Sequence, residues 1–586
     1  MSPSRRISII VVQLALLATL PFTLTAAKKN GGSELVKAGD MKEFLATISS
    51  DEYEGRATFS EGLGLAASYI SEHLRSWGVK PGGDNGSYFQ RVRVLGVKAQ
   101  NQTTITVQAN GQTRTFKNGE GITLPSNSGG KRAVTSDQIE FMGYGLEAPA
   151  AKYSDFTGKD VRGKVVVFLG SAGPKALDQT YRRLLTGRAR YAVDQKGAIA
   201  TFGPPFGGAG GRGGQPPAPA AGGQSGTPAP GPQGRGFGFG GPPIEAADFT
   251  TVQRLDSPVA PAVSAQDDFF EFLFSGQEVT YSQLKAKAAD REALPAFTLK
   301  NVKVTINIDV DYRVVRTQLT RNVVGLVEGN DPKLKKTYVA FGAHYDHVGY
   351  SEGEIVQGSL GAQRAEPRGR ITKEAIEDRF WNGADDDGSG TVTMMAIAKA
   401  FATGPKPRRS LLFVWHTGEE RGLYGSRYFA DYPTVPIDSI VAEINMDMVG
   451  RDRDNKPEEA NTVYLIGSDR ISTELHNLSV DANLALLKPL KLDFEMNDPS
   501  DLEQFYYRSD HYSYAAKGIP IVFLTTGLHP DYHANTDSAE KINYEKMGRI
   551  GQLTYLLGQR VANLDHPPAR DNRGARAGKG TAGKLE

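Results

Sequence analysis

The sequence predicts an α/β protein in which a mixed, mostly parallel sheet is sandwiched by helices and carries an inserted, smaller β-rich domain. From residue 300 onward, apolar runs alternate with helical patterns, which is typical of a strand–helix architecture. Several of these runs are near-continuous in apolar residues, as expected for strands covered on both faces. Between about 120 and 290, short β-runs punctuated by glycine replace this pattern and indicate the inserted domain.

Apolar periodicity places the individual elements. A first helix is predicted around 41–48, where apolar residues follow the i, i+3, i+4, i+7 rule. A second helix is predicted from Leu65, Ala66, Tyr69, Ile70 and Leu74. The strands predicted for the main sheet are 322–327, 337–342, 410–415, 440–446 and 519–524, with a helix over 390–402.

We expect the main domain to be discontinuous, over 36–119 and 296–564, with the β-rich domain at 120–295. Glycine and proline fill most of 203–243, a composition that cannot bury a core and predicts a disordered loop. The tail 565–586 is rich in Gly, Arg, Lys and Pro and is also predicted to be disordered.

Residues 1–27 are typical of a secretory signal peptide. Arg5 and Arg6 precede an apolar stretch from 7 to 20, and small residues at 25–27 offer a cleavage site. A membrane anchor is the alternative, but the stretch is shorter than the roughly 20 residues that span a bilayer. We therefore expect a secreted or periplasmic protein with no membrane association after cleavage.

Composition excludes several function classes. The chain has 586 residues, with 68 Lys+Arg against 66 Asp+Glu, whereas a nucleic-acid-binding protein normally has an excess of basic residues. It contains no cysteine, which excludes disulfide scaffolds, thiolate zinc sites and cysteine nucleophiles. Any bound metal must therefore use His, Asp and Glu.

The first candidate motif, Phe341-Gly-Ala-His-Tyr-Asp-His347, follows a predicted strand. In an extended segment, residues two apart point the same way, so Asp346 can act on His344. A metal-bound imidazole needs its other nitrogen held, and a carboxylate does this well. His347 offers no such pairing and is interpreted as a surface or packing histidine.

The second motif is the acidic triplet Asp385, Asp386 and Asp387, directly before the predicted helix 390–402. Three consecutive carboxylates repel one another unless a cation is present. A helix N-cap is the alternative interpretation. It explains one aspartate but not three, which favours a metal.

Three further motifs lie at or after predicted strand ends. Glu419 and Glu420 follow the strand 410–415, and their side chains should point apart, so that one can bind a metal while the other meets a water molecule. A solvated pair is the alternative. Asp447 lies among apolar residues and needs a partner, either a salt bridge or a metal. His533, in a late loop, gains significance only from the other motifs.

Together these motifs offer five oxygen or nitrogen ligands: His344, Asp386, Glu420, Asp447 and His533. Two metals that share one carboxylate need five such residues, and a metal pair of this kind clamps the attacking and leaving oxygens of a hydrolysis. One metal also lowers the pKa of a bound water towards ~7. A free carboxylate then takes the proton and passes it to the leaving amine. Glu419 is the candidate for this general base.

In this order, the five motifs resemble the co-catalytic di-zinc aminopeptidases, a family that includes glutamate carboxypeptidases and the transferrin receptor ectodomain. The resemblance covers nearly all of the mature chain and implies the zinc exopeptidase fold. The stretch from about 138 to 267 resembles the protease-associated domain that is inserted into many members. The segment 350–381 is an insertion relative to the family, near the expected cleft, and leaves specificity open.

The resemblance implies a role for each ligand. Asp386 would bridge the two metals. His344 and Asp447 would complete one site, and Glu420 and His533 the other. The metals implied are two Zn²⁺ per chain, with Co²⁺ or Mn²⁺ as possible substitutes.

The resemblance also implies roles for four neighbouring residues. Asp346 would orient His344, and Glu419 would be the general base. Tyr532 matches a tyrosine that stabilises the oxyanion in some members. Arg508 matches an arginine that contacts substrate in some members, and a structural salt bridge is its alternative.

The implied function is that of an exported aminopeptidase acting on peptides with a free N-terminus. A glutaminyl cyclase or a carboxypeptidase of the same fold remains an alternative. A non-enzymatic binding ectodomain is another, although that class should have lost its ligands, and all five are present here. The sequence gives neither the preferred N-terminal residue nor the oligomeric state.

Overall fold

The computed structural model describes residues 32–205, 245–351 and 369–572. The predicted signal peptide at 1–27 lies outside these ranges, as does most of the Gly/Pro-rich segment 203–243. Within the described ranges, no helix combines the length and the apolar character that are needed to cross a bilayer.

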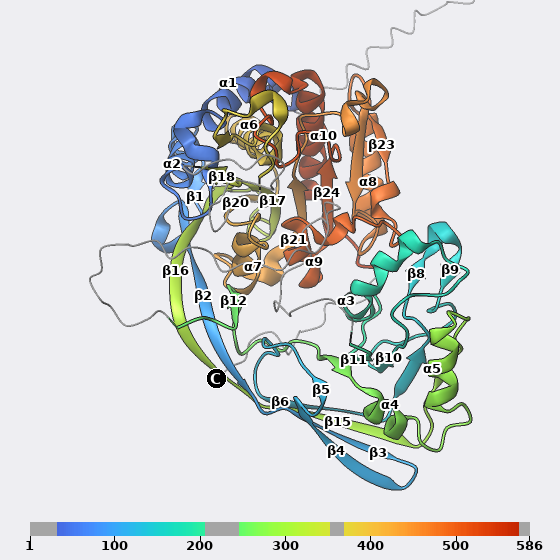
Figure 1. Ribbon diagram of the computed structural model, residues 1–586. Helices are drawn as coiled ribbons and strands as arrows, with labels where there is room; N and C mark the ends of the chain where they lie inside the picture. The colour runs from blue at the N-terminus through green and yellow to red at the C-terminus, as the bar shows by residue number, and fades with distance from the viewer. Residues whose placement is uncertain (1–31, 206–244, 352–368, 573–586) are drawn as a thin grey trace, which may run out of the picture.

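The first of two ten-stranded sheets forms the centre of the larger domain (Figure 1). Its strands are β1 (Lys80–Pro81), β2 (Phe89–Asn101), β12 (Phe249–Thr251), β16 (Val310–Val327), β17 (Tyr338–His344), β20 (Ser410–His416), β21 (Ile440–Met446), β22 (Thr462–Ile466), β23 (Lys491–Asp493) and β24 (Ile521–Thr525). They are ordered β12-β2-β16-β20-β17-β21-β24-β22-β23, with β1 beside β16. The five strands predicted from apolar runs are all present.

The sheet is parallel only at its centre and at one edge pair, rather than mostly parallel as predicted. Strands β20, β17, β21 and β24 run parallel to one another, whereas β16 pairs with β20 and β2, and β22 with β24, in antiparallel fashion. Every residue of β20 and of β21 is buried, which explains their near-continuous apolar sequences. The central parallel strands bring their carboxyl ends to one edge of the sheet.

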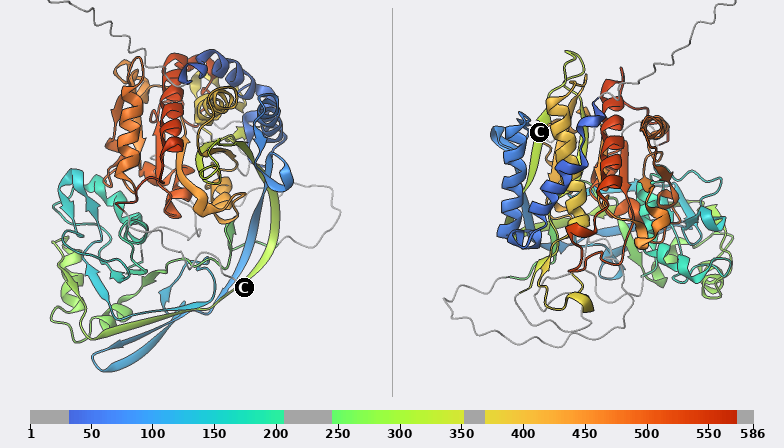
Figure 2. Two further views of the ribbon diagram at one scale, coloured as in Figure 1. Left: turned by 180° about the vertical axis from the view of Figure 1, so that it is seen from behind. Right: turned by 90° about the horizontal axis from the view of Figure 1, so that it is seen from above.

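Helices cover both faces of this sheet, as predicted. One face carries α1 (Ala38–Ile48), α2 (Glu61–Ser76), α6 (Gly390–Thr403), α8 (Thr473–Leu484) and α10 (Tyr544–Asn563), which lie side by side when seen from above (Figure 2). The other face carries α7 (Tyr424–Asp431) and α9 (His511–Ala516). In α2, Leu65 is 45 % exposed, and the buried stripe runs through Leu63, Ala66, Ala67, Ile70 and Leu74 instead.

The second sheet forms the smaller domain, at the lower right of Figure 1. Helices α3 (Arg188–Asp194), α4 (Asp267–Leu273) and α5 (Tyr281–Ala289) accompany it. Its strands are β3 (Thr104–Ala109), β4 (Gln112–Asn118), β5 (Gly121–Thr123), β6 (Arg132–Ser136), β7 (Ile139–Met142), β10 (Val165–Val167), β11 (Ala200–Gly203), β13 (Ala262–Ala265), β14 (Ala296–Thr298) and β15 (Val302–Ile308). Two short ladders, β8 (Glu147–Ala148) with β9 (Tyr153–Ser154) and β18 (Gly349–Tyr350) with β19 (Phe380–Trp381), complete the strands of the described residues.

The smaller domain extends beyond the predicted limits of 120–295. It begins with β3 and ends with β15, because β3 pairs with both β4 and β15 in the second sheet. Strands β2 and β16 pair along almost their whole length and connect the two domains (Figure 1). The domain limits therefore follow long-range strand pairing rather than the change in local composition.

The start of the predicted tail contacts the larger domain. Glu474, in the first turn of α8, accepts a hydrogen bond from the backbone N–H of Ala569, and Asp571 accepts one from the backbone N–H of Thr473. The remainder of 565–586, from 573 onward, lies outside the described residues.

Candidate active site

The predicted ligands come together at the carboxyl ends of the central parallel strands. His344 is the last residue of β17, and Asp447 follows β21 directly. Glu420 and His533 lie in the loops after β20 and β24, and Asp386 lies in the turn that precedes α6. Sites of open α/β sheets form at this edge because the loops after parallel strands converge there.

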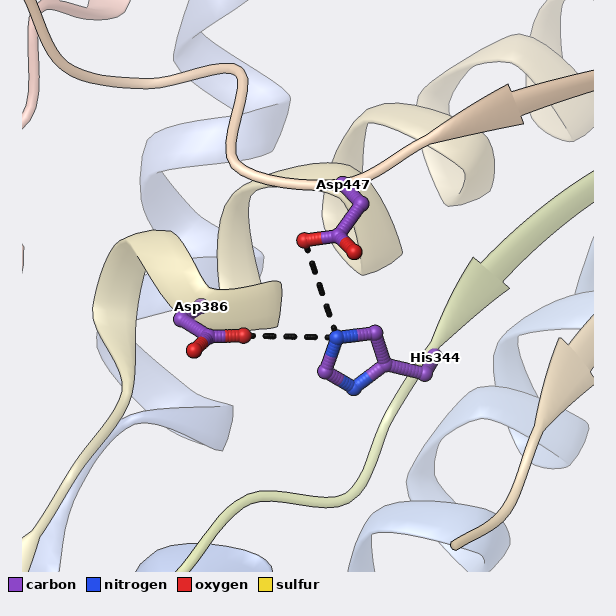
Figure 3. Close-up of side chains that lie close together, drawn as sticks. All are labelled: His344, Asp386 and Asp447. Atoms are coloured by element: carbon purple, nitrogen blue, oxygen red, sulfur yellow. Dashed lines mark ion pairs between the residues drawn. The ribbon is translucent and has the colours of Figure 1, made fainter. Parts of the chain in front are cut away.

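A first group consists of His344, Asp386 and Asp447. The Nε2 atom of His344 lies 3.3 Å from Asp386 Oδ1 and 3.7 Å from Asp447 Oδ1. Figure 3 shows both carboxylates facing this one nitrogen. Ligand atoms about 2.0–2.1 Å from a tetrahedral zinc ion are separated by about 3.3 Å, so the group has the dimensions of a zinc site.

A second group lies on the other side of Asp386. His533 Nε2 is 3.1 Å from Asp386 Oδ2 and 3.2 Å from Glu420 Oε2. Burial alone would lower the pKa of His533, but the charges of Glu420 and Asp386 raise it to about 10. Because each oxygen of Asp386 faces a different imidazole, the carboxylate is placed to bridge two cations.

The three aspartates of the acidic triplet make different contacts. Only Asp386 faces both imidazoles. Asp387 accepts the backbone N–H groups of Gly390 and Met448, at 3.0 and 3.1 Å. Asp385 faces His529 at 3.2 Å. The N-cap of α6 is Ser389, whose side chain forms no capping hydrogen bond, so the N-cap interpretation holds only in that Asp387 accepts the first N–H of the helix. The metal interpretation fits Asp386.

His347 is neither on the surface nor remote from the ligands, contrary to the surface interpretation. It is 1 % exposed, and its Nδ1 lies 2.9 Å from Glu420 Oε1 and 3.9 Å from Asp386 Oδ2. His347, Asp386 and Glu420 could themselves hold a metal ion. The alternation rule failed here because β17 ends at His344, so extended geometry no longer governs the residues that follow.

Asp346 is placed to position Glu419 rather than to bind His344 directly. Its carboxylate accepts hydrogen bonds from the backbone N–H of Glu419, at 3.1 Å, and from the hydroxyl of Thr58, at 3.0 Å. His344 Nδ1 is 3.1 Å from the backbone carbonyl oxygen of Asp346 and 3.8 Å from its carboxylate. The carbonyl thus takes the orienting role that the sequence assigned to the side chain, because the chain turns as the strand ends.

Glu419 lines the same cavity as the first metal group. Burial raises the pKa of its carboxyl well above the ordinary value, and the charges of Glu420 and Asp447 add to the rise against the opposing effect of His344. A carboxylate with a raised pKa accepts a proton more readily at neutral pH, as a general base must. Both its position and its environment suit proton transfer.

Comparison with known proteins finds a family that resembles the part of the chain carrying these groups. Residues 322–557, which supply all the groups described except Thr58, match the model for peptidase family M28. This part of the chain is similar to peptidase family M28. The matched region contains all five predicted ligands and the predicted base.

Curated proteins match part of the chain. It is 28 % identical over 190 residues to a probable leucine aminopeptidase from Arthroderma benhamiae, which covers 31 % of this chain and 48 % of the relative. It is 26 % identical over 292 residues to the probable leucine aminopeptidase 2 of Aspergillus fumigatus, with coverages of 46 % and 49 %. The chain thus spans about half the length of these relatives. A solved zinc aminopeptidase from Bacillus subtilis aligns over 91 % of this chain and 97 % of its own, at 17 % identity and a TM-score of 0.40.

Tyr532 and Arg508 lie together in the cavity that also contains Glu419. Arg508 Nη2 donates to the hydroxyl of Tyr532 at 3.2 Å, and Nη1 pairs with Glu503 at 3.1 Å. The two interpretations of Arg508, a site residue and a salt bridge, therefore both apply. Burial raises the pKa of Tyr532 above its ordinary value, so the phenol retains its proton.

The smaller domain contacts the segment that carries these residues. Arg183, in the smaller domain, pairs with Glu503 at 2.9 Å, and Glu503 also pairs with Arg508. Arg190 lies 3.9 Å above the ring of Tyr507. One wall of the cavity is thus in contact with the smaller domain.

Arg56 and Arg370 support the ligand loops, although no pattern in the sequence indicates either role. Arg56 is fully buried and donates to the carbonyl oxygens of Tyr345 and Gly383, which flank the two metal motifs. Arg370, in the insertion 350–381, donates to the carbonyl oxygens of Pro530 and Tyr532 at 2.6 and 2.7 Å. Their acceptors are backbone atoms, which leave no pattern in the sequence.

An Arg370→Ala variant should bind metal less tightly at the position formed by His533, by about 10- to 100-fold, the range for partners that orient metal ligands. The reason is that the planar guanidinium holds two carbonyls just before His533. The backbone hydrogen bonds of residue 370 to this loop would remain. Zinc titration of the metal-free protein measures the effect. Lys373→Ala, an exposed change in the same segment, is the control and should bind like the unaltered protein. Unchanged zinc affinity in Arg370→Ala would show that the Arg370 side chain does not position His533.

Proposed function

We propose that this protein is an exported zinc-dependent aminopeptidase that removes N-terminal residues from peptides. The observation that carries the proposal is the pair of histidine–carboxylate groups that share Asp386, with Glu419 beside them in one cavity. The leucine aminopeptidase relatives support the same reaction class. The expected signal peptide at 1–27 supports export to the periplasm or the medium.

Five side chains would hold two Zn²⁺ ions. Asp386 would bridge them, with His344 and Asp447 completing one position and Glu420 and His533 the other. All five offer oxygen or imidazole nitrogen, which suits zinc and also admits Co²⁺ or Mn²⁺. When bound, such a pair polarises a peptide carbonyl and generates a nucleophile from water near neutral pH.

The remaining steps fall to the protein's own groups. Glu419 takes a proton from the attacking water and delivers it to the nitrogen of the leaving amine. Asp346 keeps Glu419 in place through its backbone N–H. Tyr532, protonated and beside Arg508, donates a hydrogen bond to the developing oxyanion.

The charges of the cavity favour a free amino terminus over a free carboxylate. Asp386 and Asp447 would be neutralised by the metals that they hold, whereas the carboxylate of Glu419, which also lines the cavity, attracts an ammonium group. A carboxypeptidase needs an available cation for the substrate's C-terminus, but Arg508 is already paired with Glu503. The cavity also has apolar lining from Met448, Phe505, Phe523 and Leu528, which suits an apolar N-terminal side chain such as leucine.

The smaller domain is proposed to act as a protease-associated domain. Its contacts with Glu503 and Tyr507 support a role in limiting access to the cavity, so that extended peptides enter and folded chains do not. No nucleic acid or membrane partner is proposed.

The test measures metal content and activity together, on protein lacking residues 1–27. Hydrolysis of leucine, lysine and aspartate anilides and of N-acetylated leucine anilide is followed with and without a chelator. The proposal expects near two zinc ions per chain, cleavage of free-amine substrates only, fastest for leucine, and loss of activity on chelation. Bound zinc without cleavage of any free-amine substrate would favour the cyclase or carboxypeptidase alternative. A protein with neither bound metal nor turnover would instead be a non-enzymatic binding domain.

A further inference from the structure

His347 occupies a fixed position against the second metal group. Its ring centroid is 5.7 Å from that of His533, so the two imidazoles flank Glu420 and Asp386. The ring also packs on Gly383, where an added Cβ would lie 2.5 Å from ring carbons. Gly383 has a φ of +54°, a conformation that glycine adopts readily. Both features hold the imidazole in one place.

The ring nitrogens of His347 are buried and have no hydrogen-bond partner in the described structure. Nδ1 is only 2.9 Å from Glu420 Oε1, but the two atoms are not aligned for a hydrogen bond. Asp386 Oδ2, 3.9 Å from the same nitrogen, is also without a hydrogen-bond partner. Buried polar atoms are rarely left unpaired, and close contact without alignment is expected of atoms that face a common third group.

We propose that His347 is an additional nitrogen ligand of the second metal position, an inference that rests on the proposed two-metal function. That position then offers two imidazoles, from His347 and His533, together with Glu420 and one oxygen of Asp386. The first position offers the single imidazole of His344 with two carboxylates. The two positions thus differ in donor set although they share a bridge.

This difference gives the centre a loading order. Imidazole is a favourable ligand for zinc, whereas carboxylate-rich sites also suit harder ions such as Mn²⁺. The second position should therefore take zinc first and hold it more tightly. The first position should exchange its ion more easily and accept Mn²⁺ in its place.

The alternative is that His347 lies outside the metal's ligand shell and only orients Glu420 by donating a hydrogen bond. The two roles differ in how much metal affinity is lost when His347 is replaced. Loss of an orienting partner costs about 10- to 100-fold, whereas loss of a ligand should cost more than about 100-fold. They also differ in which substitution restores binding. In His347→Asn, an amide N–H near the Nδ1 position could still orient Glu420 but would be a poor metal ligand.

The experiment uses residues 28–586 loaded with Co²⁺. Proton NMR counts the imidazole N–H signals that are shifted by the paramagnetic ion and exchange with solvent. Three signals are expected, from His344, His347 and His533, and His347→Ala should lose one. Zinc titration of the metal-free proteins should show one binding step weakened by more than about 100-fold in both His347→Ala and His347→Asn. His476→Ala, a histidine on α8 whose Nδ1 bonds Ser468, is the matched control and should keep three signals.

Two signals in the unaltered protein, or affinity restored by His347→Asn, would overturn the inference in favour of an orienting role. Circular dichroism of each metal-free variant separates loss of a ligand from loss of folding. If His347→Ala does not fold, the comparison rests on His347→Asn, whose folding the same measurement checks. Three signals from a protein that cleaves no peptide would support the metal assignment and refute the proposed activity alone. Failure to bind Co²⁺ at all would refute both.

Discussion

Replacing Glu419 by glutamine is expected to leave both metal ions bound and to lower kcat by about 10²- to 10⁴-fold, the contribution of a positioned general base. The amide has nearly the same shape and can still accept the surrounding contacts, but it cannot take a proton from water. Its backbone N–H remains free to bond Asp346, so the loop should keep its conformation. The loss should therefore appear in kcat, with little change in KM.

Zinc content and steady-state kinetics on leucine anilide measure this result together. Glu278→Gln, an exposed change in the smaller domain, is the control and should leave both unchanged. A Glu419→Gln protein with full metal and near-normal kcat would assign the base to another residue. A protein that had lost its metal would show that Glu419 supports the ligands rather than the proton transfer.

Replacing Asp386 by asparagine is expected to abolish activity through loss of metal at both positions. In the metal-free protein, burial alone would raise the pKa of Asp386, but His344 and His533 hold it well below the ordinary value. The carboxylate is thus ionised and faces both positions at once. Asparagine offers a single neutral oxygen and cannot bridge, so affinity should fall by more than about 100-fold at each position.

Metal analysis after dialysis, with circular dichroism to establish folding, measures this loss. Asp137→Asn, an exposed change in the smaller domain, is the control. If the Asp386→Asn protein retained one full equivalent of zinc, the carboxylate would belong to a single position and the shared-bridge arrangement would be wrong.

Four of the five ligands could be predicted because each lies at or after the end of a strand that composition reveals. Strands β20 and β21 are buried on both faces and therefore consist almost entirely of apolar residues, so the acidic residues just beyond them stand out. Their convergence follows from parallel pairing, which the strand–helix alternation predicts. Asp386 is harder to identify as the ligand, since its two neighbours are also aspartates. The resemblance distinguishes it from them.

Other features could not be predicted, for identifiable physical reasons. His347 lies beyond the end of β17, where no periodicity says which way a side chain points. Arg370 acts on carbonyl oxygens, which every residue has. The connection from the smaller domain back to the larger one runs along β16, whose residues from 311 to 319 are all exposed or half-buried and do not resemble a core strand.

The pairing of β2 with β16 means that the smaller domain is, in topological terms, an enlarged hairpin loop. Asn101, the last residue of β2, and Val310, the first of β16, are directly opposite each other in an antiparallel ladder. Two strands in this relation can be joined by a turn of about two residues. A domain with adjacent entry and exit points can be gained, lost or exchanged during evolution without reordering the strands that carry the metal ligands. Substrate access and metal chemistry could therefore diverge independently in proteins built on this plan.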